Sequence, residues 1–113
     1  IHLGDVDRMP FQADSFSKIC SVNTIYFWLD LESTARKILR LLVPGGMLFL
    51  GFEDRFQMDQ RPLDPDVFRI FEAAEVETIL MNTGLVRDVA TRSIAKGSSV
   101  FHCTVATRHE GPI

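Results

Sequence analysis

The sequence predicts an α/β fold in which helices pack on a mixed sheet of about four strands. Three observations predict this class. An apolar strand, an amphipathic helix and a second apolar strand follow one another between residues 18 and 52. A second amphipathic helix is predicted over residues 73–82. Two β-rich segments joined by a short polar turn then end the chain.

The first strand and the first helix are predicted from the spacing of apolar residues. Ile19–Val22 is short and mostly apolar, and it ends in the polar residues Asn23 and Thr24. Asp30 is a good N-cap for a helix that begins after it. The apolar residues that recur with helical spacing are Leu31, Ala35, Ile38, Leu39 and Leu42. They form one apolar face, as expected for an amphipathic helix.

The segment Pro44-Gly45-Gly46 is predicted to end this helix and to make the turn into the next strand. Proline cannot continue a helix, and glycine tolerates a positive φ. Met47–Phe52 is nearly all apolar, which is typical of a strand buried on both faces of a sheet. The strand, helix and strand therefore form a βαβ unit with parallel strands.

The second half of the chain begins with a polar stretch. Residues 53–66 contain two prolines and are predicted to be a long loop, followed by a short extended piece at residues 68–71. A helix is predicted over Ala73–Asn82, with Gly84 at its C′ position. The segments Val86–Ala95 and Ser99–Thr107 are predicted to pair as a hairpin.

Composition is that of one soluble domain. The chain has 113 residues, of which 46% are hydrophobic and 24% charged. The net charge of -3 and the pI near 5.5 argue against a nucleic-acid surface, which is normally basic. The longest apolar stretch, Ile38–Phe52, is too short and too interrupted to span a bilayer. No signal peptide is recognised, and we expect a cytoplasmic protein with neither nucleic-acid nor membrane partners.

The cysteines and histidines do not predict a metal site. Cys20 and Cys103 lie in apolar, β-branched segments and are predicted to be buried free thiols. The three histidines, His2, His102 and His109, show no close spacing with cysteine.

Taken in order, the segments resemble the C-terminal half of class I, Rossmann-like S-adenosylmethionine (SAM) dependent methyltransferases. The resemblance is greatest to the small-molecule branch that includes ubiquinone-biosynthesis-type enzymes. It covers nearly the whole chain, and it rests on the order and spacing of several weak motifs. These are Gly4-Asp5-Val6 with Met9-Pro10-Phe11 and Ser15-Phe16, the segment Val22–Trp28, the segment Ile38–Gly46, and the closing helix, Gly84 and hairpin.

The resemblance implies cofactor contacts at four residues. Asp5 matches the acidic residue that accepts the adenine amino group, and the N–H of Val6 would face the ring. Asn23 and Thr24 would face the amino-acid part of SAM, because open α/β sheets bind ligands beyond the carboxyl ends of their strands. Two alternatives remain open: Gly4-Asp5 is a simple turn, and Asn23 and Thr24 only cap the strand.

The resemblance also implies a substrate pocket bordered by Tyr26, Trp28 and Phe56. An aromatic wall could hold a flat methyl acceptor, or the methylsulfonium by cation–π contact. Core packing is an equal alternative for Tyr26 and Trp28, and it is the favoured interpretation for Phe27. No catalytic residue is predicted.

The sequence departs from the family pattern at several points. Ser17 stands where a carboxylate is usual, and Val43 stands where Lys or Arg commonly precedes Pro-Gly-Gly. The glycine-rich loop that holds methionine and the acidic residue that holds ribose do not occur in these 113 residues. Such a loop lets the backbone approach the ligand and donate its N–H groups. We therefore expect residues 1–113 to be a single domain that is inactive as an isolated chain.

The strand near residues 18–23 is predicted to be an exposed edge, since its usual neighbour would lie in the glycine-rich half. We expect this edge to pair with a second copy in a homodimer or with that half. Three functions follow: the C-terminal portion of a SAM-dependent methyltransferase acting on a small molecule, a non-catalytic dimeric binding module, or one half of a split enzyme.

Overall fold

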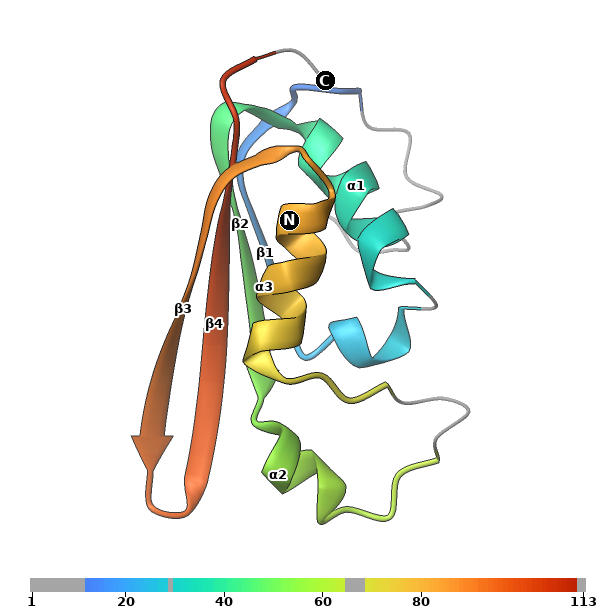
Figure 1. The fold of residues 1–113 in the computed structure, drawn as a ribbon, viewed down its shortest axis with the longest axis vertical. Helices are drawn as coiled ribbons and strands as arrows, with labels where there is room; N and C mark the ends of the chain where they lie inside the picture. The colour runs from blue at the N-terminus through green and yellow to red at the C-terminus, as the bar shows by residue number, and fades with distance from the viewer. Residues whose placement is uncertain (1–11, 29, 65–68, 112–113) are drawn as a thin grey trace.

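The computed structural model describes residues 12–28, 30–64 and 69–111. Within these ranges a four-stranded sheet carries helices on one face (Figure 1). The elements in chain order are β1 (Phe16–Val22), the 3-10 helix η1 (Ile25–Phe27), α1 (Leu31–Leu41), β2 (Leu42–Glu53), α2 (Arg55–Asp59), α3 (Ala73–Asn82), β3 (Val86–Lys96) and β4 (Ser99–Arg108). The predicted α/β class and mixed sheet are confirmed.

The strand order is β1-β2-β4-β3. β1 and β2 are parallel, as the βαβ prediction requires, and β4 is antiparallel to both β2 and β3. The predicted hairpin is confirmed by the pairing of Lys96 with Ser99, around Gly97 at φ 63°. β1 lies at one edge of the described sheet.

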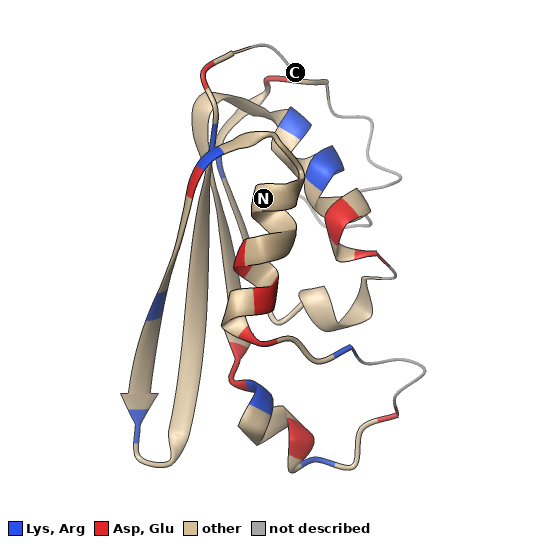
Figure 2. Cartoon of the chain, in the orientation of Figure 1, with Lys and Arg blue, Asp and Glu red and all other residues tan. Residues whose placement is uncertain are grey.

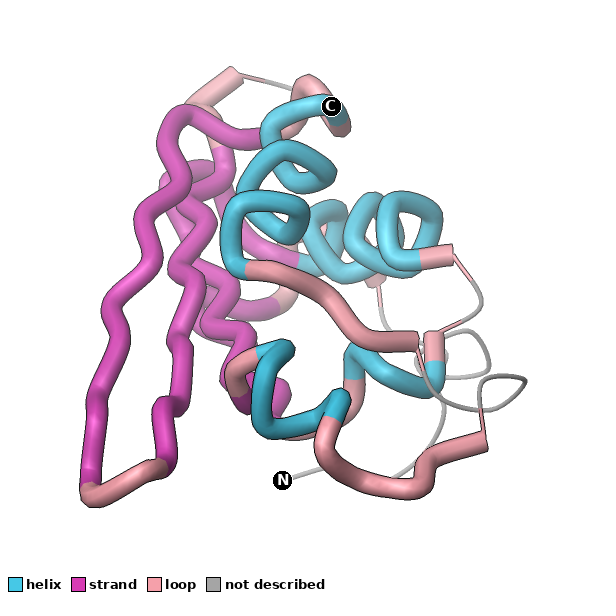
Figure 3. Tube along the Cα trace, turned by 60° about the horizontal axis from the view of Figure 1, so that its bottom comes forward, coloured by secondary structure: helices cyan, strands magenta, loops and turns pink. Residues whose placement is uncertain are grey.

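The helices form because their ends are capped and their apolar faces are buried. The Asp30 carboxylate accepts a hydrogen bond from Ser33 N at 3.2 Å, as predicted for the N-cap of α1. Glu72 and Glu75 form a capping box at the start of α3. The turned view in Figure 3 also shows that the helices lie on one side of the sheet, as in Figure 1. The fully buried core residues on this side include Ile25, Ala35, Leu39, Leu48, Leu50, Phe52, Val76, Leu80 and Ala106.

The other face of the sheet carries no helix in the described ranges (Figures 1 and 3). Side chains alternate across a sheet, so Cys20, Phe49 and Val105 lie side by side on this outer face. Both cysteines are free thiols, as predicted. The prediction that they are buried is wrong, because Cys20 is exposed on this face and Cys103 is only half-buried.

Pro44-Gly45-Gly46 lies within β2, so the prediction that it is a turn between helix and strand is wrong. Phe16 pairs with Leu42 and Lys18 pairs with Met47, so the intervening residues form an irregularity in the ladder. Gly45 has φ +77°. A Cβ on Gly46 would lie 2.8 Å from Val43 O. The glycines therefore permit a bulge, and the chain keeps its pairing with β1.

The predicted long loop after β2 contains the short helix α2. The polar sequence of this segment does not predict a helix. The helix begins after Asp54, whose carboxylate accepts a hydrogen bond from Phe56 N at 3.0 Å. The predicted extended piece at residues 68–71 is described only from Arg69. Arg69 N donates to Tyr26 O at 2.8 Å, which joins this piece to η1.

Candidate functional site

The carboxyl ends of the parallel strands β1 and β2 lie at the same edge of the sheet, where α/β proteins bind ligands. Asn23 directly follows β1, and its backbone N donates to Gly51 O of β2 at 2.8 Å. Asn23 has φ 56°, a left-handed conformation that asparagine adopts more readily than most residues. Its side chain is exposed. We refer to residues 23–26 and Glu53 as the strand-end site.

The Tyr26 hydroxyl links the two strand ends. It donates to Asn23 Oδ1 at 3.1 Å and accepts from the backbone N of Glu53 at 2.6 Å. The Tyr26 ring belongs to the core, with only 4% of the residue exposed. Burial raises the pKa of Tyr26 above its ordinary value, so the hydroxyl keeps its proton at neutral pH.

The neighbouring predicted residues have different surroundings. Thr24 is half-buried, and its hydroxyl is hydrogen-bonded to the Ser21 hydroxyl. Trp28 packs against the core cluster. Phe27 is 53% exposed, so the prediction of core packing is wrong for this ring, which meets Tyr26 edge-on at 6.4 Å. The short η1 turn buries Ile25 and Tyr26 and leaves the third side chain outside.

An ion pair folds the segment after β2 back onto the strand end. Arg61 Nη1 lies 2.7 Å from Glu53 Oε2, and Arg61 Nη2 lies 2.6 Å from Glu53 Oε1. Gln57 Nε2 adds a weaker bond to Glu53 Oε1 at 3.4 Å. The Arg61 guanidinium lowers the pKa of Glu53 below its ordinary value, mainly through these hydrogen bonds.

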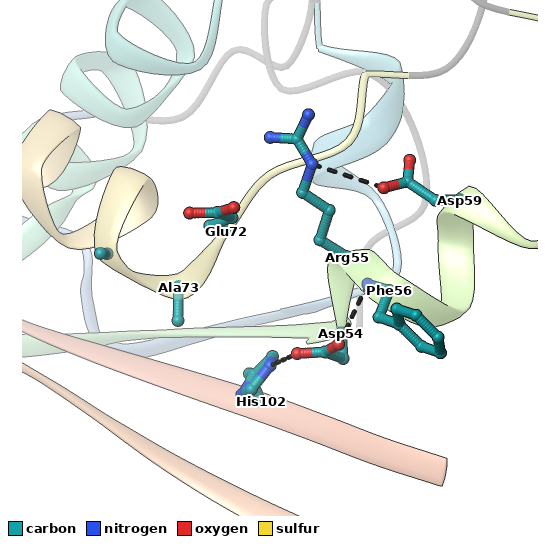
Figure 4. A pocket seen from close by; sticks show the side chains of 8 residues that line it. Asp54, Arg55, Phe56, Asp59, Glu72, Ala73 and His102 are labelled. Carbon is teal, nitrogen blue, oxygen red and sulfur yellow. Dashed lines mark hydrogen bonds and ion pairs between the residues drawn. The ribbon is translucent and has the colours of Figure 1, made fainter. Parts of the chain in front are cut away.

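A concave region lies between α2, the start of α3 and β4 (Figure 4). It is an open pocket of about 460 Å³ lined by Asp54, Arg55, Phe56, Asp59, Glu72, Ala73, Ala74 and His102. The Asp54 carboxylate lies 2.8 Å from His102 Nε2 and caps α2. The hydrogen bond to His102 lowers the pKa of Asp54. His102 Nδ1 lies 2.6 Å from Ser93 Oγ.

The structure therefore separates the predicted substrate residues. Phe56 lines the pocket of Figure 4 and is 72% exposed, whereas Tyr26 and Trp28 do not line it. Asp5 and Val6 lie outside the described residues. Sequence reasoning missed the pair of Asp54 and His102, which are 48 residues apart and meet only because β2 and β4 are neighbours.

The ion pair between Glu53 and Arg61 predicts a pH dependence of stability. The folded pKa of Glu53 is lowered, so its stabilisation is complete above the unfolded pKa, about 4.3, and is lost as the pH falls through the folded value. The free energy of unfolding in urea should thus fall as the pH is lowered from about 5 through the unfolded and then the folded pKa of Glu53. The free energy of unfolding of Glu53→Gln should fall less over this interval. A drop of the same size in both proteins would contradict this assignment.

Comparisons with known proteins bear on the fold. A family model described as "Methyltransferase domain" matches residues 1–50. The sterol 24-C-methyltransferase of Pneumocystis carinii is 26% identical over 110 residues, which are 97% of this chain and 29% of that protein. A SAM-dependent methyltransferase structure from Thermotoga maritima superposes with a TM-score of 0.75 at 19% identity, over 93% of this chain and 62% of that one.

A further SAM-dependent methyltransferase structure, from Mesorhizobium loti, has a TM-score of 0.70 at 15% identity, over 93% of this chain and 68% of that one. The chain carries a class I methyltransferase fold. The predicted resemblance to class I methyltransferases is confirmed, and the ubiquinone-type branch stays a prediction. The chain spans 29% of the sterol methyltransferase and 62% of the Thermotoga maritima protein.

None of the helices in the described part of the chain has the length and apolar character needed to cross a membrane. Nor do three or more His, Cys, Asp or Glu side chains gather there in a group that could hold a metal ion.

Proposed function

We propose that this chain is part of a SAM-dependent methyltransferase that acts on a small molecule in the cytoplasm. The proposal rests on the arrangement of the strand-end site. Two parallel strands of a methyltransferase fold end together there, and Asn23 and Thr24 are fixed directly beyond them. Asp5, Val6, Asn23 and Thr24 are the proposed cofactor contacts, and of the three aromatic residues expected to border the substrate only Phe56 lines the pocket of Figure 4.

The residues at the strand-end site fit the amino-acid part of SAM. The exposed Asn23 amide offers N–H donors for a carboxylate, and its oxygen is already used by Tyr26. SAM would supply a methyl group on a sulfonium centre. The contribution of this chain would be to bind and orient the two reactants, which is the main requirement of a transfer between them.

A glycine-rich segment outside these 113 residues is part of the proposal. β1 is an edge of the described sheet, and Val22 on it is 52% exposed. Figure 2 shows that β2 and β4 carry charge only near their ends, whereas the outer strands β1 and β3 also carry Lys18 and Arg92. An unpaired edge strand of this kind favours the addition of another segment. We propose that the chain binds SAM only with that segment.

A non-catalytic homodimer is the second candidate. The same observation favours it, because the β1 edge could pair with its copy in a second molecule. Sedimentation of the 113-residue chain at micromolar concentration separates the two ideas. A stable monomer would argue against the dimer.

Calorimetry with SAM tests the proposed function. The full reading frame that encodes these residues should bind SAM, whereas the 113-residue chain alone should give no binding heat. In the full protein, Asn23→Gly keeps the positive φ and removes the amide, and it should weaken binding by about tenfold. Tight binding by the isolated chain would overturn the need for a glycine-rich segment. No binding by the full protein would overturn the proposed function.

A further inference from the structure

We infer that the Tyr26 hydroxyl is a positioning group, which fixes Asn23 so that its amide N–H groups face a hydrogen-bond acceptor of the ligand. This inference rests on the proposed function and assigns a role that the sequence did not indicate. The expected role was a wall of the substrate pocket. The buried ring instead acts through Asn23, which is the exposed residue of the pair.

The direction of each hydrogen bond follows from the chemistry of its partners. The backbone N–H of Glu53 can only donate, so Tyr26 O must accept at that 2.6 Å contact. The hydroxyl proton is then left for Asn23 Oδ1, 3.1 Å away. An amide whose oxygen accepts from Tyr26 turns its two N–H bonds away from that hydroxyl. Each group therefore donates to the next one. Glu53 N–H donates to Tyr26 O, Tyr26 O–H donates to Asn23 Oδ1, and the Asn23 N–H groups point away from Tyr26.

The same hydroxyl spans the two strands that form the site. Asn23 follows β1, whereas Glu53 is the last residue of β2. The Tyr26 hydroxyl is hydrogen-bonded to both, and a second link between the strands is the hydrogen bond from Asn23 N to Gly51 O. Asn23 is thus held through its backbone and through its side chain, although it is exposed. A fixed, exposed pair of N–H donors suits a carboxylate, such as that of the amino-acid part of SAM.

The charged groups near Tyr26 are consistent with a hydroxyl that only donates and accepts hydrogen bonds. Glu53 and Arg61 are the charged side chains that influence it, and they form an ion pair with each other. Because burial raises the pKa of Tyr26, the proton that Asn23 Oδ1 accepts is retained over the range in which enzymes are assayed.

Tyr26→Phe tests this role in the full protein. The ring and its packing remain while the hydroxyl is lost, and SAM affinity should fall by about tenfold. Thr91→Val is the matched control. It removes one member of the pair of hydroxyls of Thr91 and Thr104, 2.8 Å apart in the middle of the sheet, and should leave SAM affinity unchanged. The side-chain amide signals of Asn23 in a ¹⁵N spectrum should shift in Tyr26→Phe and stay in place in Thr91→Val.

Asn23→Asp tests the donor assignment. Aspartate also tolerates the left-handed conformation and can accept from Tyr26, but it replaces the N–H donors by a charged acceptor. SAM affinity should fall by more than about tenfold. Equal affinity in Asn23→Asp, or wild-type affinity in Tyr26→Phe, would overturn the inference. If the wild type itself binds no SAM, the proposed function fails, and the Asn23 amide signals still decide whether Tyr26 positions that side chain.

Discussion

Replacing Phe52 by alanine is expected to lower the free energy of unfolding by about 3–5 kcal/mol. Phe52 is fully buried near the end of β2, and its ring centroid lies 5.4 Å from that of His102. Its removal would leave a cavity between the sheet and the helices that cover it, and the surrounding side chains can fill only part of this space. Urea unfolding monitored by circular dichroism measures the loss.

Phe56→Ala is the matched control for this change. It deletes the same side chain four residues further along, at a position that is 72% exposed. Its effect should stay within about 0.5 kcal/mol, as for most surface substitutions. Equal losses in the free energy of unfolding of the two variants would contradict the burial of Phe52.

Arg108→Ala is the second large effect, with an expected loss of about 2–4 kcal/mol. The Arg108 side chain is 3% exposed, and its Nη1 donates to the backbone oxygen of Leu42 and to the Asp14 carboxylate. It thereby ties the end of β4 to the start of β2 and to the residues before β1. Alanine would leave the Leu42 carbonyl without this donor. Asp14 is 55% exposed and can be hydrated instead, which places the loss below that of a fully buried pair.

The controls for Arg108 separate its burial from its charge. Arg92→Ala removes an exposed arginine of β3 and should change stability by no more than about 0.5 kcal/mol. Arg108→Lys keeps the charge but loses the planar fork, and it should recover only part of the loss. Full recovery by lysine would show that a single cationic donor is enough at this position and that the planar fork adds nothing. That result would contradict the expectation that the guanidinium is needed to reach both Leu42 and Asp14.

The regular elements could be predicted because local patterns determine them. The helical spacing of Leu31, Ala35 and Ile38 predicts α1, and the apolar run after Gly46 predicts the part of β2 that follows it. The helix α2 could not be predicted in this way, because its capping residue Asp54 follows a strand directly and its sequence is polar. A signal existed in Asp54 itself, since aspartate is a favoured N-cap.

The site was only partly predictable. Asn23 and Thr24 follow from the rule that ligands bind beyond strand ends, and the structure does place them there. The role of Tyr26 needs the register between β1 and β2, which brings Asn23 close to Glu53, and sequence alone does not give it. The exposure of Cys20 likewise depends on which face of the sheet the helices cover.

The fold by itself does not establish methyl transfer, because a fold of this kind can support several activities. Our proposal is narrower, namely that SAM binds at the ends of β1 and β2. Addition of SAM should therefore change the surroundings of residues at one end of the sheet only. The strand-end site should respond, and the opposite end of the sheet, near Gly45 and Gly84, should not.

An NMR titration of the ¹⁵N-labelled full protein with SAM tests this claim most directly. The backbone amide signals of Asn23 and Thr24 and the side-chain amide signals of Asn23 are expected to move with a common binding curve. The signals of Gly45 and Gly84 are expected to stay in place. Binding that moves Gly45 or Gly84 and leaves Asn23 and Thr24 unchanged would contradict the proposed cofactor site.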